Sequence, residues 1–449
     1  MKKYILTLLV SFMAISASAQ LRTAYFMEGS YFRTDMNPAL IPTRSYFTLP
    51  AIGGVGVGLN NNFLSVSNFV YQKEGQLVTA LDSRVPASEF LAKLPDVPTV
   101  AQSLNLNLLG VGFYTKKMFW NFGINARMNS EIATSKDLFR IAKNIGNGTY
   151  NLSSTSLDMS AYGEVYLGFC LPLTKYFRVG AKVKGLVGLL NVGAQLSEGD
   201  ISVTPDAVTG TVRGKIRGSG LMVNPNYKPG SKYGEGDYDI MAEQLNLNNL
   251  KSGGLAVDLG AELRILDDHL KVSVGVIDLG FIKWSDASAA AADISADFGY
   301  RGVDFESGEV MTDMEASAIM ASRESYVRRL NCTLNIGAEY NVLDNHIAFG
   351  LLSHTEFRQA HTISELTASV NFRLGRDFTT TFSHTFCGRN YPGIFGFALN
   401  AHPGGINLFL GMDYIETNYA TYGEIPVPKN LKSFNFYFGL GFNLGKNKF

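Results

Sequence analysis

The sequence predicts an all-β protein, a transmembrane antiparallel β-barrel of about 14 strands with an N-terminal lumen plug and long extracellular loops. Three observations predict this fold class. Short turns alternate with longer connections from residue 46 to residue 444, and most segments between them alternate apolar and polar residues one by one. A secretory signal precedes these segments. Strands with two unlike faces, joined by short turns at one end and long loops at the other, are typical of bacterial outer-membrane barrels.

The N-terminus has the pattern of a signal peptide. Lys2 and Lys3 precede an apolar run that ends at Ile15, and small residues follow at positions 17–19. We therefore expect residues 1–19 to be removed by cleavage before Gln20. The remaining sequence has no apolar stretch of about 18 residues, so a helical membrane protein is excluded.

Residues 20–45 form the predicted N-terminal hatch or plug. This segment holds Tyr25, Phe26 and Tyr31 among other aromatic residues, which makes it too hydrophobic to extend into water. Pro38 and Pro42 restrain its backbone and remove hydrogen-bond donors. We expect the segment to fold back into the lumen. The alternative is that part of it forms another strand or packs under the barrel.

Residues 46–449 form the predicted barrel. An even number of strands places both termini and all short turns on the periplasmic side of the outer membrane of a Gram-negative bacterium. Residues 200–221 and 294–305 could also form strands, so the count could err by two. In the outer loops, residues 134–146 have helical spacing after a Thr-Ser cap, and residues 311–326 are a weaker helix candidate. The predicted spans are 46–60, 103–113, 117–130, 156–171, 175–191, 253–266, 269–284, 327–342, 345–357, 362–374, 377–387, 393–401, 405–415 and 433–444.

Charged residues on the polar face of these strands are the candidate ligand contacts in the wall. The alternation places them toward the lumen, where opposite charges favour a closed interior over a wide water-filled pore. Barrel interiors are normally polar, so the same residues could simply fill and rigidify the lumen. The set comprises Arg178, Lys182, Lys184, Asp258, Glu262, Arg264, Glu339 and Arg373, and Glu365 shares the pattern.

Two short motifs carry a resemblance to known proteins. Asn37-Pro38-Ala39, which lies before a glycine-rich first strand, resembles the hatch motif of the long-chain fatty-acid transporter (FadL-like) superfamily. Together with the later segment 278–284, it is still more similar to an uncharacterised Bacteroidota family of outer-membrane barrels of unknown function. The resemblance implies a 14-stranded barrel in which Asn37, Pro38 and Ala39 belong to the hatch. The superfamily includes channels for hydrophobic molecules and barrels that partner a secretion machine.

Other function classes find little support in the sequence. It has no Gly-x-Ser-x-Gly elbow, no His-Glu-x-x-His and no cysteine pair at metal spacing, so we expect no enzyme, no metal site and no cofactor. The formal net charge is zero, and no basic cluster indicates a nucleic-acid partner.

Two functions remain open. The first is a plugged outer-membrane barrel, a passive channel or binder for a hydrophobic small molecule. The second is a non-transporting anchor or scaffold for a secreted or surface protein complex. In either case the outward faces of the strands would contact outer-membrane lipid.

Overall fold

The structure is a computed structural model. It describes residues 22–50, 52–116, 118–220, 247, 250–303, 310–315, 320–359, 361–375, 377–386, 394–417, 419–422, 425–428 and 433–445. The predicted signal peptide, residues 1–19, lies outside the described residues.

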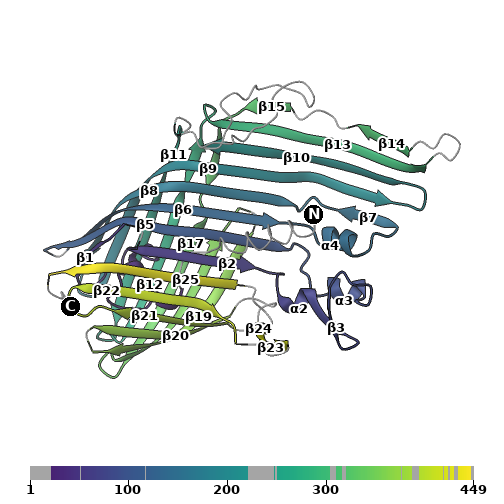
Figure 1. Ribbon diagram of the computed structural model, residues 1–449. Coiled ribbons are helices and arrows are strands. Elements are labelled where there is room, and N and C mark those ends of the chain that lie inside the picture. The colour runs from purple at the N-terminus through teal and green to yellow at the C-terminus, as the bar shows by residue number, and fades with distance from the viewer. Residues whose placement is uncertain are drawn as a thin grey trace.

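Fourteen antiparallel strands of the described chain close into a barrel (Figure 1), which confirms the predicted fold class. Closure occurs at the first strand, because Val55 pairs with Leu106 on one side and with Phe438 on the other. The first strand is divided into β1 and β2, and the eighth into β16 and β17. The wall consists of β1 (Ser45–Thr48), β2 (Gly54–Asn61), β5 (Thr99–Thr115), β6 (Met118–Ala133), β8 (Ser156–Pro172), β9 (Phe177–Val203), β11 (Ser252–Ile265), β12 (Leu270–Trp284), β16 (Tyr326–Arg329), β17 (Cys332–Val342), β18 (Ile347–Phe357), β19 (Thr362–Leu374), β20 (Phe378–Phe386), β21 (Ile394–Ala401), β22 (Ile406–Ile415) and β25 (Ser433–Leu444).

The strands have an apolar outer face and a polar inner face. On β11, Leu255 and Leu259 are 63% and 49% exposed, whereas Asp258 between them is fully buried. Val183 on the neighbouring strand β9 is 59% exposed, and Lys182 and Lys184 on either side of it are buried. This arrangement is that of a barrel whose outer face contacts lipid and whose lumen is filled with side chains.

One end of the barrel, which we call the turn end, carries tight turns. In the β11–β12 turn, Leu266, Asp267 and Asp268 have φ angles of 56°, 52° and 69°, and residues 343–345 of the β17–β18 turn have nearly the same values. Aspartate and asparagine adopt this left-handed conformation more readily than most residues, which explains their presence in both turns. The opposite end carries the long connections, and we call it the loop end.

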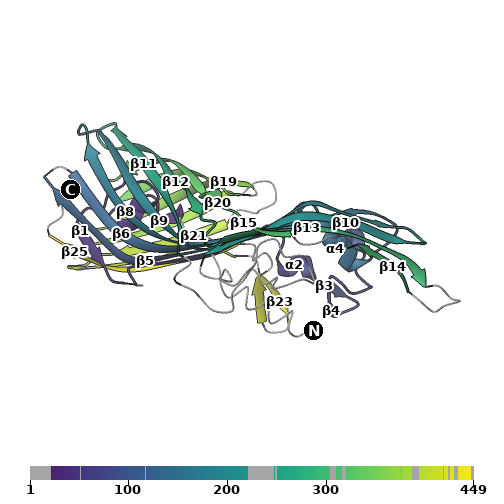
Figure 2. The same cartoon turned by 90° about the horizontal axis from the view of Figure 1, so that it is seen from above.

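At the loop end, part of the wall continues as a projecting sheet (Figure 2). Strand β9 extends to Val203, far beyond its predicted end at residue 191, and the expected loop 192–252 therefore begins as strand. Residues 200–221 and 294–305 contain strands, which the sequence allowed as an alternative. These strands pair with β9 and with each other and do not enter the closed wall. The helix considered for residues 311–326 is wrong, because the described residues 310–315, 320–323 and 326–329 form strands. The additional strands are β7 (Gly148–Asn151), β10 (Val208–Gly220), β13 (Ala289–Val303), β14 (Val310–Glu315) and β15 (Met320–Arg323).

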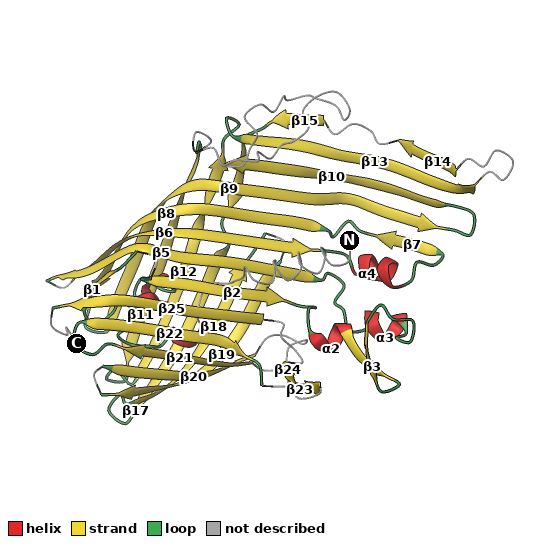
Figure 3. Cartoon of the chain, in the orientation of Figure 1, coloured by secondary structure: helices red, strands yellow, loops and turns green. Residues whose placement is uncertain are grey.

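A small helical cap also lies at the loop end (Figure 3). Phe139 packs with Phe63, Phe69 and Phe90 at ring-centroid distances of 5.4 to 6.3 Å. The predicted helix at residues 134–146 is confirmed as α4, whose N-cap Ser135 accepts a hydrogen bond from the backbone N–H of residue 137 at 3.1 Å. In the described part of the chain, no helix is long and apolar enough to span a bilayer. The cap contains α2 (Val66–Phe69), β3 (Val70–Lys73), β4 (Gln76–Thr79), α3 (Ala87–Leu91) and α4 (Lys136–Lys143), and a separate hairpin pairs β23 (Tyr419–Tyr422) with β24 (Ile425–Pro428).

Candidate functional site in the barrel lumen

The N-terminal segment, residues 22–43, lies inside the barrel and precedes β1 directly. It includes two short 3-10 helices, η1 (Arg22–Ala24) and η2 (Tyr31–Asp35), and nearly all of its side chains are buried. The aromatic rings of the segment pack against rings of the wall in one hydrophobic cluster. Within it, the Phe32 ring lies 4.8 Å from Phe409 and 4.6 Å from Tyr437, measured between centroids. The lumen is therefore closed at the level of this segment.

Asn37, Pro38 and Ala39 dock against three wall glycines, which we call the glycine slot. Gly180, Gly260 and Gly275 lie side by side on β9, β11 and β12. A Cβ atom at Gly260 would overlap Asn37 Oδ1, and one at Gly180 would overlap the carbonyl of Pro38. Only glycine lets the backbone of the segment approach the wall so closely.

Asn37 holds the segment in this slot through both ends of its amide. Its Nδ2 donates to the carbonyl oxygen of Val274 in β12 at 3.1 Å and to the Tyr25 hydroxyl at 3.2 Å. Its Oδ1 accepts from the backbone N–H of Ala39 at 2.9 Å, which fixes the turn at Pro38. The residues of the predicted hatch motif therefore lie together at one docking point, and their role as a hatch stays a prediction.

Arg22 anchors the start of the described segment to the opposite part of the wall. Its Nε lies 2.6 Å from Glu365 Oε2 of β19, and its Nη1 donates to the Tyr414 hydroxyl of β22 at 2.5 Å. The backbone N–H groups of Arg22 and Thr23 donate to the two carboxylate oxygens of Asp413 at 2.9 and 2.8 Å. All of these side chains are buried, so this ion pair is shielded from solvent.

Two acidic residues of the segment make further ion pairs on its two sides. Glu28 faces the turn end, where it pairs with Lys271 and lies 3.6 Å from Arg373. Burial acts to raise the pKa of Glu28, but the charges of Arg373 and Lys271 outweigh it and hold this pKa below its ordinary value. Asp35 faces the loop end and pairs with Lys182 at 2.7 Å.

A buried charge network joins five strands of the wall. Lys184 Nζ lies 2.8 Å from Asp258, 2.5 Å from Asp278 and 3.7 Å from Glu164. Arg127 of β6 reaches Asp278 at 2.7 Å and Glu164 at 3.1 Å. Asp278 has a φ of 59° and sits beside a break in the β11–β12 register, where its N–H donates to Asp258. The charged pairs therefore link five consecutive strands along one side of the lumen.

The eight predicted wall residues therefore fall into separate groups. Lys184 and Asp258 belong to the buried network, whereas Lys182 pairs with Asp35 of the N-terminal segment. Nearer the turn end, Glu262 pairs with Arg178 and with Arg264, and Glu339 pairs with Arg373. All eight have charged partners, and their contact with a ligand stays a prediction.

Among the cavities lined by described residues, three lie along the lumen. The central cavity, of about 70 Å³, lies on the loop-end side of Phe32, Asp35 and Met36. The mouth cavity, of about 30 Å³, lies next to it and shares Tyr162 and Glu356 with it. The vestibule, of about 700 Å³, opens at the turn end below Glu28 and neighbouring residues of the N-terminal segment.

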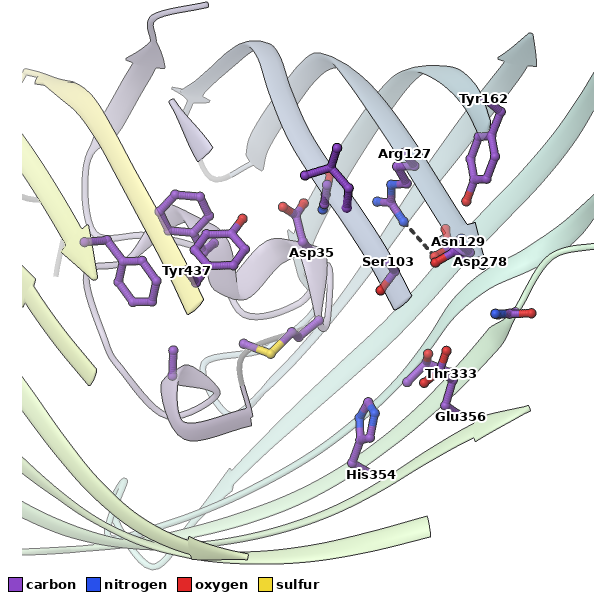
Figure 4. Close-up of a pocket in the computed structure, with 17 residues that line it drawn as sticks. Asp35, Ser103, Arg127, Asn129, Tyr162, Asp278, Thr333, His354, Glu356 and Tyr437 are labelled. Atoms are coloured by element: carbon purple, nitrogen blue, oxygen red, sulfur yellow. Dashed lines mark hydrogen bonds and ion pairs between the residues drawn. The ribbon is translucent and has the colours of Figure 1, made fainter. Parts of the chain in front are cut away.

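Figure 4 shows the two unlike sides of the central cavity. Tyr437 lies on one side, with Phe32 and Phe409 also in the lining, and Arg127 and Asp278 lie on the other. A polar chain connects the cavity to the N-terminal segment. His354 Nδ1 lies 2.7 Å from Asn335 Oδ1, and Asn335 Nδ2 donates to the carbonyl of Met36 at 2.9 Å.

Sequence reasoning missed several residues of this site. Arg127, His354 and Asn335 lie on inward faces, so the alternation that found Lys184 would also have placed them in the lumen. Asp278 belongs to the 278–284 motif, but the motif gives no indication that its carboxylate is buried. Arg22, Glu28 and Asp35 precede the first strand, and no periodic signal indicates the direction of their side chains.

A family model described as "Family of unknown function (DUF5723)" matches residues 38–413 of the chain, which is most of its length. The chain belongs to the DUF5723 family. This membership confirms the expected place in an uncharacterised family. A comparison of this DUF5723 chain with curated proteins found no match.

Two solved structures are similar to the DUF5723 chain over nearly its whole length. The CymD monoaromatic hydrocarbon channel is 8% identical, with 93% of this chain and 94% of that chain covered and a TM-score of 0.41. The P. putida toluene transporter TodX is 11% identical, with 96% of each chain covered and a TM-score of 0.39. Identities this low show a likeness of fold alone.

Proposed function

We propose that this protein is a gated outer-membrane channel for small molecules that contain an apolar part. The N-terminal segment acts as its plug. The observation that carries the proposal is that cavities lie on both sides of the docked segment, about 70 Å³ toward the loop end and about 700 Å³ toward the turn end. Movement of this one segment would join the two cavities without opening the closed wall.

The proposed orientation places the turn end and both termini in the periplasm and the loop end outside the cell. The signal-peptide pattern and the distribution of short turns and long connections support this orientation. The outward apolar side chains, such as Leu255 and Val183, would then contact outer-membrane lipid.

The aromatic side of the central cavity supports an apolar part in the ligand. Phe409 and Tyr437 belong to the wall, and their rings lie 5.5 Å apart. Phe32 of the plug completes this surface. A ligand in contact with these rings would touch the plug and the wall together, and it could shift the plug only if it bound the open position more tightly.

Deletion of the plug tests this proposal. A chain that lacks residues 22–43 should make liposomes leaky to small charged probes, which cross a bare bilayer poorly, whereas the complete chain should keep them sealed. The shift in electrophoretic mobility on boiling provides the assembly control, because closed barrels resist detergent until they are heated. Equal leakage from two well-assembled barrels would contradict a gated channel.

The projecting sheet favours the second candidate, a scaffold for a secreted or surface protein. Strands β9, β10 and β13 extend beyond the barrel, a feature that transport through the lumen does not require. If this function is correct, a stable partner protein should co-purify with the complete chain in detergent. The partner should be lost when residues 192–219 and residues 289–303 are each replaced by a short linker. Retention of the partner by the shortened chain would argue against the sheet as the binding surface.

A further inference from the structure

The mouth cavity contains three arginines near the loop end of the lumen. Arg328 pairs with Asp158, and Arg329 donates to the carbonyl oxygens of Phe357 and Arg358. The guanidinium groups of both residues are therefore engaged. Arg358, the third arginine in the lining, differs from them.

Arg358 is only 4% exposed and is incompletely bonded. Its Nη2 donates to Glu356 Oε2 at 2.9 Å, but its Nε and Nη1 have no hydrogen-bond partner among the described residues. Buried donors normally find partners, because an unpaired buried donor loses its hydration without compensation. The unused N–H groups of Arg358 therefore indicate a missing hydrogen-bond acceptor in the mouth cavity.

The carboxylates that line the cavity do not supply this acceptor. Glu131 contacts His361, Asp158 pairs with Arg328, and Glu356 already binds Arg358 through its other nitrogen. Glu131 Oε1 and Asp158 Oδ1 also lack hydrogen bonds among the described residues, but neither is bonded to the unused N–H groups of Arg358. A planar guanidinium fork is best matched by a carboxylate, which can accept two parallel hydrogen bonds.

The neighbouring central cavity limits the rest of the ligand. Glu356, the partner of Arg358, lines both cavities and so lies at their junction. Beyond this junction the aromatic surface of Phe32, Phe409 and Tyr437 can contact an apolar group. The cavity volumes of about 30 and 70 Å³ suit a compact molecule and not a long chain.

We propose that the channel selects compact carboxylates with an apolar body. Arg358 captures the carboxylate in the mouth cavity, and the apolar body then passes against the aromatic surface of the central cavity. This inference rests on the proposed channel function and adds the chemical class of its ligand.

Binding of benzoate and of its neutral analogue benzamide to the purified barrel tests the proposal. Isothermal titration should show that the complete chain binds benzoate at least about tenfold more tightly, as expected for a charge-assisted fork. The double variant Arg358→Gln with Glu356→Gln preserves the charge balance and should lose this preference while its affinity for benzamide is unchanged. The matched control Arg213→Gln removes an arginine of the projecting sheet and should keep the preference.

Several results would overturn the proposal. These are equal binding of benzoate and benzamide by the complete chain, and a preserved preference in the double variant. If the double variant does not assemble, Arg358→Lys keeps the charge without the fork and should still reduce the preference. Sulfate lacks an apolar body, so in a competition titration its affinity should be at least about tenfold lower than that of benzoate. An equal affinity would overturn the proposed role of the apolar body.

Two separate readouts distinguish this inference from the channel function. If deletion of residues 22–43 makes liposomes leaky to small charged probes while the complete chain prefers neither benzoate nor benzamide, the channel stands and the carboxylate selectivity fails. If deletion leaves the leakage of these probes unchanged, the channel itself fails.

Discussion

Two of the attachments between the proposed plug and the wall use different kinds of interaction. At the glycine slot, Asn37 and its neighbours are held by neutral hydrogen bonds and by close backbone approach to Gly260. At the other place, Arg22 is held by buried carboxylates of Glu365 and Asp413. Docking at the glycine slot depends on shape, so added side-chain volume should weaken it. Docking through Arg22 depends on charge, so the loss of a charged partner should weaken it.

Replacement of Arg22 by alanine should have the largest effect on plug docking. It leaves the buried carboxylates of Glu365 and Asp413 without their cation, which typically costs about 3–5 kcal/mol. Hydrogen exchange of the backbone amides at residues 23–43 should then become at least about a hundredfold faster in the assembled barrel. Arg22→Lys, which keeps the charge, should lose less protection. Unchanged exchange in the alanine variant would show that the remaining contacts hold the plug without Arg22.

Gly260→Ala should weaken the slot by overpacking, typically by about 1–3 kcal/mol. The added methyl group would overlap Asn37 Oδ1, so the plug must shift away from β11. Gly163→Ala is a matched control on β8, since a Cβ at that position has open space around it. Liposome leakage should rise for the first variant only. Equal leakage from the two variants would contradict a tight slot.

Asn37→Ala should have an effect of similar or smaller size. It removes the amide that bonds Val274 and Ala39, and unpaired buried groups cost about 1–3 kcal/mol. The variant should assemble normally, as judged by its mobility before and after boiling, and show altered uptake of a hydrophobic probe. Normal assembly with unchanged uptake would mean that the slot does not control the gate.

Glu28→Gln should have the smallest effect, because Glu28 is partly exposed and such ion pairs contribute about 1 kcal/mol or less. The pKa of Glu28 is lowered in the folded protein, so its contribution is present above its ordinary pKa of 4.5 and is lost as the pH falls further. Leakage of the parent chain should therefore rise modestly below this pH. The glutamine variant should leak slightly more at neutral pH and respond less to acid.

The wall could be predicted from the sequence because its pattern is local. Each strand alternates within itself, which is why Lys184 and Asp258 were placed in the lumen without knowledge of their partners. The glycine slot could not be recognised in the same way. Gly180, Gly260 and Gly275 become neighbours only through the register of three strands, which a single sequence does not specify.

The projecting sheet was only partly predicted for a related reason. Residues 311–326 offer weak helical spacing, but the described residues 310–315 and 320–323 pair with β13 instead. Pairing with a neighbouring strand satisfies their backbone groups, and this tertiary context outweighs a weak local preference. The ion pairs of Arg22 and Glu28 likewise depend on how the plug folds back, for which the sequence contains no repeating pattern.

The length of β9 has a consequence for the cell surface. A tilted strand crosses a bilayer in about 9–11 residues, whereas β9 runs from Phe177 to Val203. At roughly 3.3 Å per residue, its part beyond residue 190 is roughly 40 Å long. In the proposed orientation, this part stands clear of the lipid head groups and reaches into the sugar layer that coats the cell. An antibody raised against the tip of the sheet would therefore detect living cells whether the gate is open or shut.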